Sequence, residues 1–67
     1  MKREWKLIAT AQTVDGIEKL INEFYFSTRY SVHPQSLEIL HDGKPVNNQA
    51  MRIVMKKERF RFEIAVF

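Results

Sequence analysis

The fold is decided by the C-terminal stretch MRIVMKKERFRFEIAV, residues 51–66. On both sides of residues 56–59, apolar side chains alternate with charged or small ones, and this period of two is typical of a half-buried β-hairpin. The connection lacks the Gly or Asn that tight two-residue turns prefer. We therefore predict a four-residue loop, Lys56 to Arg59, built on a type I turn.

The register of this hairpin follows from the same alternation. If Met55 lies opposite Phe60, the apolar residues of both arms share one face of the hairpin. The same register sets Arg52 opposite Glu63 on the other face, where opposite charges favour each other. Both faces are therefore consistent with one pairing.

Residues 4–11 also alternate and predict a strand, with one face shared by Trp5, Leu7 and Ala9. Asp15 followed by Glu18 has the spacing of a capping box, so we expect a helix to start near Asp15. The apolar stripe of that helix consists of Ile17, Leu20, Ile21 and Phe24. Its end stays open between Asn22 and Ser27, because alternate residues from 24 to 32 also fit a strand.

The central segment supplies one more strand before the hairpin. Leu37 to His41 is predicted as a short strand, Asp42-Gly43 as a turn, and Pro45 limits any strand after the turn to a sheet edge. The order is then β-α-β-β-β, with the strand order open. We predict a single α+β domain over residues 1–67, a two-layer sandwich of one helix on a mainly antiparallel four-stranded sheet.

The composition fits a folded soluble domain. The chain has 67 residues, 45% hydrophobic and 28% charged, and it contains no cysteine, which excludes a disulfide scaffold and a Cys-ligated zinc module. No apolar run approaches the roughly 20 residues of a membrane span, and no secretory signal is expected, so we expect a cytoplasmic protein. A core this small makes stabilisation by self-association plausible.

One helix covers one face of the predicted sheet, so alternate residues face the other side. Apolar residues among charged ones on such a face are a common mark of an interaction surface, although scattered surface aliphatics are also ordinary. The predicted contact centre of this protein interface is Ile8, Leu40, Val54 and Phe67. Two such sheets packing face to face would form a homodimer.

All of the positive excess of the chain, whose net charge is +3, falls in residues 52–61. The basic residues of this predicted patch are Arg52, Lys56, Lys57, Arg59 and Arg61. They form a candidate nucleic-acid footprint, because Lys and Arg displace counterions from phosphates, although charged hairpin ends also serve solubility. Phe60 and Phe62 alternate with Arg61, so we expect them on the core side, away from a bound single strand.

Catalytic chemistry has no recognisable support in the sequence. His33 and His41 match no ligand spacing with nearby carboxylates, the serines lie in no nucleophile elbow, and Gly16 and Gly43 are isolated. We expect no enzyme activity, cofactor, metal or small-molecule substrate. An aromatic group remains after the helix stripe, either a binding anchor or packing at the sheet edge: Tyr25, Phe26 and Tyr30.

The leading hypothesis is a small non-catalytic interaction module. It binds a protein, or itself as a homodimer, through the open sheet face and the basic C-terminal hairpin. The alternative is a nucleic-acid-binding accessory or regulatory protein that uses the basic hairpin. Neither hypothesis involves a membrane, and neither names the partner.

Overall fold

The computed structural model describes residues 3–67, with one helix and two small antiparallel sheets. The first sheet has the order β1-β6-β5, formed by Glu4–Ala11, Arg59–Val66 and Met51–Lys56. The second has the order β2-β3-β4, formed by Tyr30–Val32, Ile39–His41 and Lys44–Pro45. The α+β class is confirmed, whereas the single four-stranded sheet in the order β-α-β-β-β is wrong.

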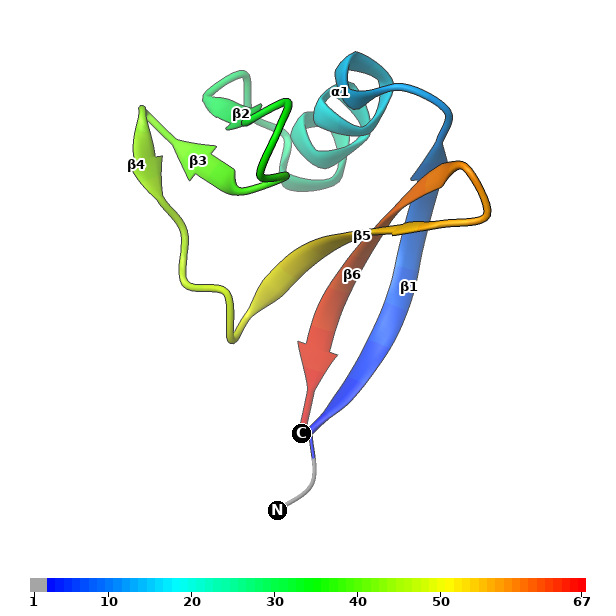
Figure 1. Cartoon of the computed structure of the whole chain (residues 1–67). Helices are drawn as coiled ribbons and strands as arrows, with labels where there is room; N and C mark the ends of the chain where they lie inside the picture. The colour runs from blue at the N-terminus through cyan, green and yellow to red at the C-terminus, as the bar shows by residue number, and fades with distance from the viewer. Residues whose placement is uncertain (1–2) are drawn as a thin grey trace.

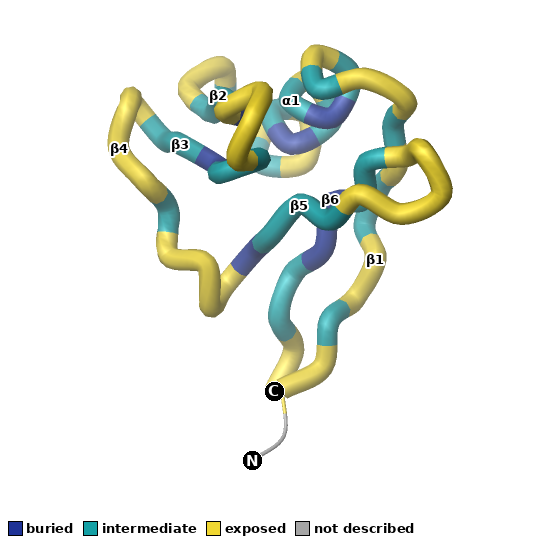
Figure 2. The backbone as a smooth tube through the Cα atoms, in the orientation of Figure 1, coloured by how far each residue is buried: buried dark blue, intermediate teal, exposed yellow. Residues whose placement is uncertain are grey.

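Helix α1, Val14–Tyr25, and the second sheet lie on the same side of the first sheet (Figure 1). The buried residues come from both groups of elements and meet between them: Ile17, Ile21, Val32, Ile39, Met51 and Phe62 (Figure 2). No helix in the described part of the chain is long and apolar enough to cross a membrane.

The second sheet forms because its first strand bonds to the helix instead of to β5. The Asn22 side chain donates to the Tyr30 carbonyl and accepts from the Tyr30 N–H, both at 2.9 Å. The Glu18 carboxylate accepts from the Val32 N–H at 3.1 Å. Two polar side chains of α1 thus satisfy the backbone edge of β2, so this strand has no need of a neighbour from the first sheet.

The turn between β3 and β4 agrees with the sequence. Asp42 and Gly43 have φ of 53° and 79°, as a tight two-residue hairpin turn requires. The following strand is only Lys44–Pro45 and lies at the sheet edge, where a residue without an N–H is tolerated.

The predicted register of the C-terminal hairpin is confirmed, but its turn is shorter than expected. Met55 pairs with Phe60 and Arg52 with Glu63, and the ladder continues to Lys56 opposite Arg59. Only Lys57 and Glu58 remain in the turn, with φ of 51° and 61°. A turn with two positive φ values matches the right-handed twist of the strands, and this twist overrides the preference of Lys and Glu for negative φ.

A β-bulge in β1 changes which residues face the core. The pairing runs Leu7 with Glu63 and then Ala9 with Phe62, which leaves Ile8 as the extra residue. Ile8 packs against the core, and Leu7 is 43% exposed. The prediction that Ile8 faces outward is therefore wrong, because the inserted residue shifts the alternation by one place.

The helix starts at Val14, close to the predicted start near Asp15, but its N-cap lies two residues before the predicted one. Thr13 is the N-cap, and its side chain accepts from the Gly16 N–H at 2.9 Å, so the Asp15 capping box is wrong. The predicted stripe is confirmed at its centre, where Ile17 and Ile21 are fully buried. The helix ends at Tyr25, within the range left open, and Phe26 follows as a left-handed C-cap.

The aromatic residues after the stripe divide between core and surface. Tyr25 stacks on Tyr30 with ring centroids 4.8 Å apart, and it also contacts Phe62 edge-on. Burial, with a smaller effect of Tyr30, raises the pKa of Tyr25 above its ordinary value. These two tyrosines pack beside the core, whereas Phe26 is 97% exposed.

Candidate interaction surface

One face of the first sheet points away from α1. Phe62 points into the core under the helix, so the residues that alternate with it along β6 point to the opposite side. Cross-strand partners share a face, which assigns the neighbours on β1 and β5 as well. We call this surface the open face; its members are Trp5, Leu7, Thr10, Arg52, Val54, Lys56, Arg59, Arg61, Glu63 and Ala65.

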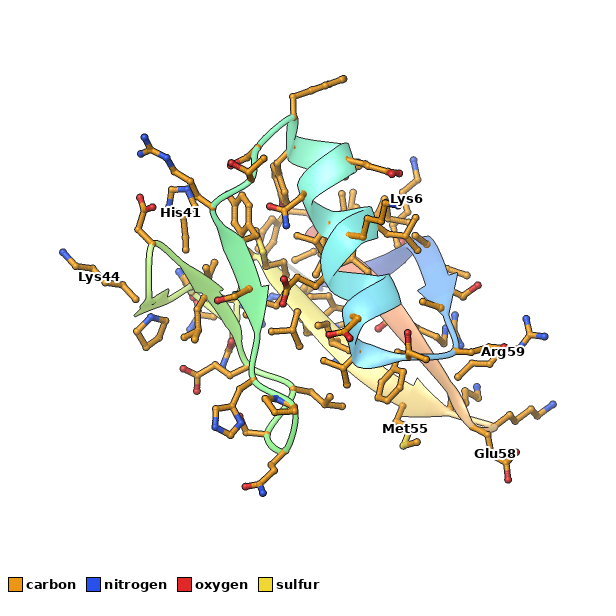
Figure 3. All side chains as sticks on the ribbon, turned by 90° about the horizontal axis from the view of Figure 1, so that it is seen from above. Lys6, His41, Lys44, Met55, Glu58 and Arg59 are labelled. Carbon is orange, nitrogen blue, oxygen red and sulfur yellow. The ribbon has the colours of Figure 1, made fainter. Side chains whose placement is uncertain are left out.

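The hairpin end of the open face is basic. Lys56 and Arg59 lie directly opposite each other, and with Lys57, Arg61 and Thr10 they line a shallow hollow of about 270 Å³. Among residues 3–67, no carboxylate forms an ion pair with Lys56, Lys57 or Arg59. Figure 3 shows Arg59 and Glu58 at one end of the molecule and Lys44 at the other. We call Lys56, Lys57, Arg59 and Arg61 the basic end.

The middle of the open face is held together by one buried carboxylate. Glu63 is 7% exposed and accepts from Arg52 Nε at 2.8 Å, while Arg61 approaches its other oxygen at 3.5 Å. The Arg61 Nε is buried without a hydrogen-bond partner in the described part of the chain. The Arg52–Glu63 contact is the stronger of the two, because it is the shorter one and is a hydrogen bond. Glu63 thus neutralises Arg61 less completely than it neutralises Arg52.

Arg52 belongs to this central cluster and not to the basic end. Its guanidinium carbon lies 4.0 Å from the centroid of the Trp5 ring, a cation–π arrangement across the sheet. The predicted basic patch therefore separates into two parts. Four of its members gather at the hairpin, and Arg52 is tied to Glu63 and Trp5.

Aromatic rings lie at the end of the open face remote from the hairpin. The Arg3 guanidinium carbon is 5.8 Å from the Trp5 ring centroid and 5.5 Å from that of Phe67, so one cation joins both rings. Phe67 is 75% exposed. Basic groups and aromatic rings thus share one surface, on which the sequence predicted Phe67 but not Trp5.

The predicted contact centre is not assembled. Val54 lies on the open face opposite Arg61, and Phe67 lies near Trp5 at the far end. Ile8 packs in the core, and Leu40 belongs to β3 in the second sheet, where it pairs with Ser31 and Pro45. The two sheets are separate, so the four residues do not form one patch.

Sequence reasoning placed Thr10 on the open face but missed Trp5 and Leu7. The signal was present in the apolar run Leu7-Ile8-Ala9, which interrupts the alternation of residues 4–11. An interruption of this kind in an edge strand is where a bulge is expected. Once the bulge is placed there, the indole and the basic side chains fall on the same side.

The two histidines have local structural contacts. His33 Nδ1 accepts from the Gln35 and Ser36 N–H groups, each at 3.2 Å, and the His41 ring lies 4.5 Å from the Tyr30 ring. Within residues 3–67, no group of His, Asp or Glu side chains is arranged to hold a metal ion. The first contact is the usual way in which a side chain stabilises a turn.

Comparison with protein families, with curated proteins and with solved structures found no match to this chain. The functional argument therefore depends on the geometry of the open face.

Proposed function

We propose that this protein is a small non-catalytic interaction module and that its open face binds single-stranded nucleic acid. The observation that carries the proposal is the basic end: Lys56 directly faces Arg59, and Lys57 and Arg61 border the same hollow. Like charges placed opposite each other in a sheet destabilise the fold. A phosphate backbone supplies an ion-pair partner to Lys56, Lys57 and Arg59, which have none within residues 3–67.

The rest of the open face favours a single strand over a duplex. Proteins that bind single strands combine a positively charged track with aromatic rings on which bases stack. Here the basic end leads past Arg52 to Trp5 and Phe67 along the same sheet. The faces of the bases in a duplex are already covered by stacking on neighbouring bases, so a duplex can use only the basic end.

The proposal is tested by the salt dependence of binding. We expect a labelled oligonucleotide of about 12 to 16 nucleotides to bind at about 50 mM salt and to dissociate as salt rises to about 200 mM. Arg59→Ala should lower the slope of log affinity against log salt by about 0.7, because one phosphate contact is lost from a single strand. Fluorescence anisotropy measures both quantities.

The matched control for this titration is Lys44→Ala. Lys44 is exposed in β4 and lies at the opposite end of the molecule from Arg59 (Figure 3). Its removal lowers the net charge equally and should leave the slope unchanged. Absence of binding at about 50 mM salt, or equal slopes for the two variants, would refute the proposal, because phosphate contacts are strongest at low salt.

A protein partner on the same face is the second candidate. It is favoured by two apolar side chains near the Arg52–Glu63 pair: the 43% exposed Leu7, which lies opposite Glu63, and the half-buried Val54, which follows Arg52 on the same face of β5. Exposed apolar side chains bordered by charged ones are a common mark of a protein interaction site. We expect Val54→Glu to keep the fold, since Val54 points away from the core, and to abolish capture of a partner protein or a face-packed copy.

This second candidate is tested by measuring the mass of the complex in solution, while circular dichroism checks that the variant is folded. A variant that retains the native spectrum but loses a complex seen with the unaltered chain supports protein binding through the open face. A complex with another protein that persists in Val54→Glu contradicts it.

A further inference from the structure

Strand β1 is an edge strand with a free side. Within the part of the chain that the structure describes, it pairs only with β6, in the sheet order β1-β6-β5. The Ala65 N–H donates to the Ala50 carbonyl at 2.9 Å, so the backbone of Ala65 is turned toward β5 and away from β1. Trp5 lies opposite Ala65, and its own N–H and C=O therefore point outward from the sheet. By the alternation of an antiparallel ladder, the backbone groups of Leu7 point outward as well.

The charges around Trp5 are self-complementary. Glu4 and Lys6 are exposed neighbours of Trp5, and neither has an ion-pair partner among residues 3–67. If two β1 strands pair antiparallel about a two-fold axis at Trp5, each Glu4 faces Lys6 of the other copy. These are non-hydrogen-bonded pairs, in which side chains approach most closely.

Other registers that use the outward backbone groups are less favourable. Pairing centred on Glu4 sets two carboxylates opposite each other, and pairing centred on Lys6 sets two ammonium groups opposite each other. Pairing centred on Leu7 places Lys6 against the apolar Ile8 of the bulge. Charge therefore selects one register, and the bulge after Leu7 limits the regular ladder to residues 3–7.

We propose that a second copy of this chain is the partner of the β1 edge. Two protomers pair through residues 3–7 about Trp5 and form one continuous sheet in the order β5-β6-β1-β1-β6-β5. In such a sheet Arg3 lies opposite Leu7 of the other copy, and the two Trp5 rings meet on the open face. The pairing uses backbone groups at the sheet edge, so it leaves the open face accessible and does not depend on the proposed nucleic-acid function.

The test exchanges the charges at Glu4 and Lys6 and measures the mass of the protein in solution. Sedimentation equilibrium over about a hundredfold range of concentration should show the mass rising from 8.0 kDa to twice that value. Lys6→Glu and Glu4→Lys each convert two attractive pairs into two repulsive ones and should weaken dimerisation at least about tenfold. The double variant Glu4→Lys with Lys6→Glu restores both attractive pairs and should recover the dimer.

Val54→Glu separates edge pairing from packing between open faces. Edge pairing predicts that this variant dimerises like the unaltered chain, since Val54 lies on β5, two strands away from the free edge. Circular dichroism checks that each variant is folded. The proposal is overturned by a monomer at every concentration, by a dimer that ignores both single charge reversals, or by failure of the double variant to recover it.

Discussion

Phe62→Ala is expected to leave the chain unfolded in water at room temperature. Phe62 is fully buried at the centre of β6, and its ring contacts those of Phe24 and Tyr25 at centroid distances of 5.7 Å and 6.3 Å. Truncation of a buried Phe to Ala costs about 3 to 5 kcal/mol, because apolar surface is exposed and a cavity remains. A domain of this size rarely has more than roughly 3 to 5 kcal/mol to lose.

The matched control is the same substitution at Phe26. Phe26 is 97% exposed, so Phe26→Ala removes little packing and should change the free energy of unfolding by less than about 0.5 kcal/mol. Urea titrations followed by circular dichroism measure both variants. A cooperative transition for Phe62→Ala close to that of the unaltered chain would show that the core is not organised around this ring.

The part of the fold that includes Phe62 is also the part that the sequence determines. In the C-terminal hairpin, the apolar alternation and the Arg52–Glu63 pair favour the same register, and that register is observed. A slip by one residue would turn every core side chain to the outside. The helix stripe is equally clear, since Ile17 and Ile21 are the residues buried against the sheet. Strong periodicity over several residues is what made these elements predictable.

The division into two sheets could not be predicted, because it depends on side-chain contacts between distant segments. Asn22 bonds to both backbone groups of Tyr30, and Glu18 bonds to the Val32 N–H. In the sequence, the same two residues belong to the polar side of an amphipathic helix, which is ordinarily solvated. Their role appears only when the strand lies beside the helix.

Only part of the candidate surface was predicted, because residues close in the sequence could be grouped whereas residues on distant strands could not. The basic end is a local feature of one hairpin, so its residues could be grouped from the sequence. The predicted contact centre depended on the correct placement of several strands at once. Ile8 does not belong to it because of the bulge in β1, and Leu40 does not belong to it because β3 lies in the second sheet. Errors of this kind accumulate with each long-range pairing that must be assumed.

Lys56→Glu is expected to stabilise the fold while it weakens nucleic-acid binding about a hundredfold at low salt. In the unaltered chain Lys56 lies directly opposite Arg59, two like charges at the end of the hairpin ladder. The substitution turns this pair into an attractive one, which stabilises the sheet by up to about 1 kcal/mol. The same change removes one phosphate contact and engages Arg59 with the new carboxylate, so that two contacts are lost from the basic end.

A gain in stability together with a loss of nucleic-acid affinity would show that the basic end is a binding surface and does not merely keep the protein soluble. Thermal unfolding should shift to higher temperature, and anisotropy at about 50 mM salt should show the loss of affinity. Lys44→Glu changes the net charge by the same amount in β4 and should retain the affinity within about threefold, because salt screens distant charges. If Lys56→Glu and Lys44→Glu weaken binding equally, the oligonucleotide responds to net charge alone. The basic end then has no specific part in recognition.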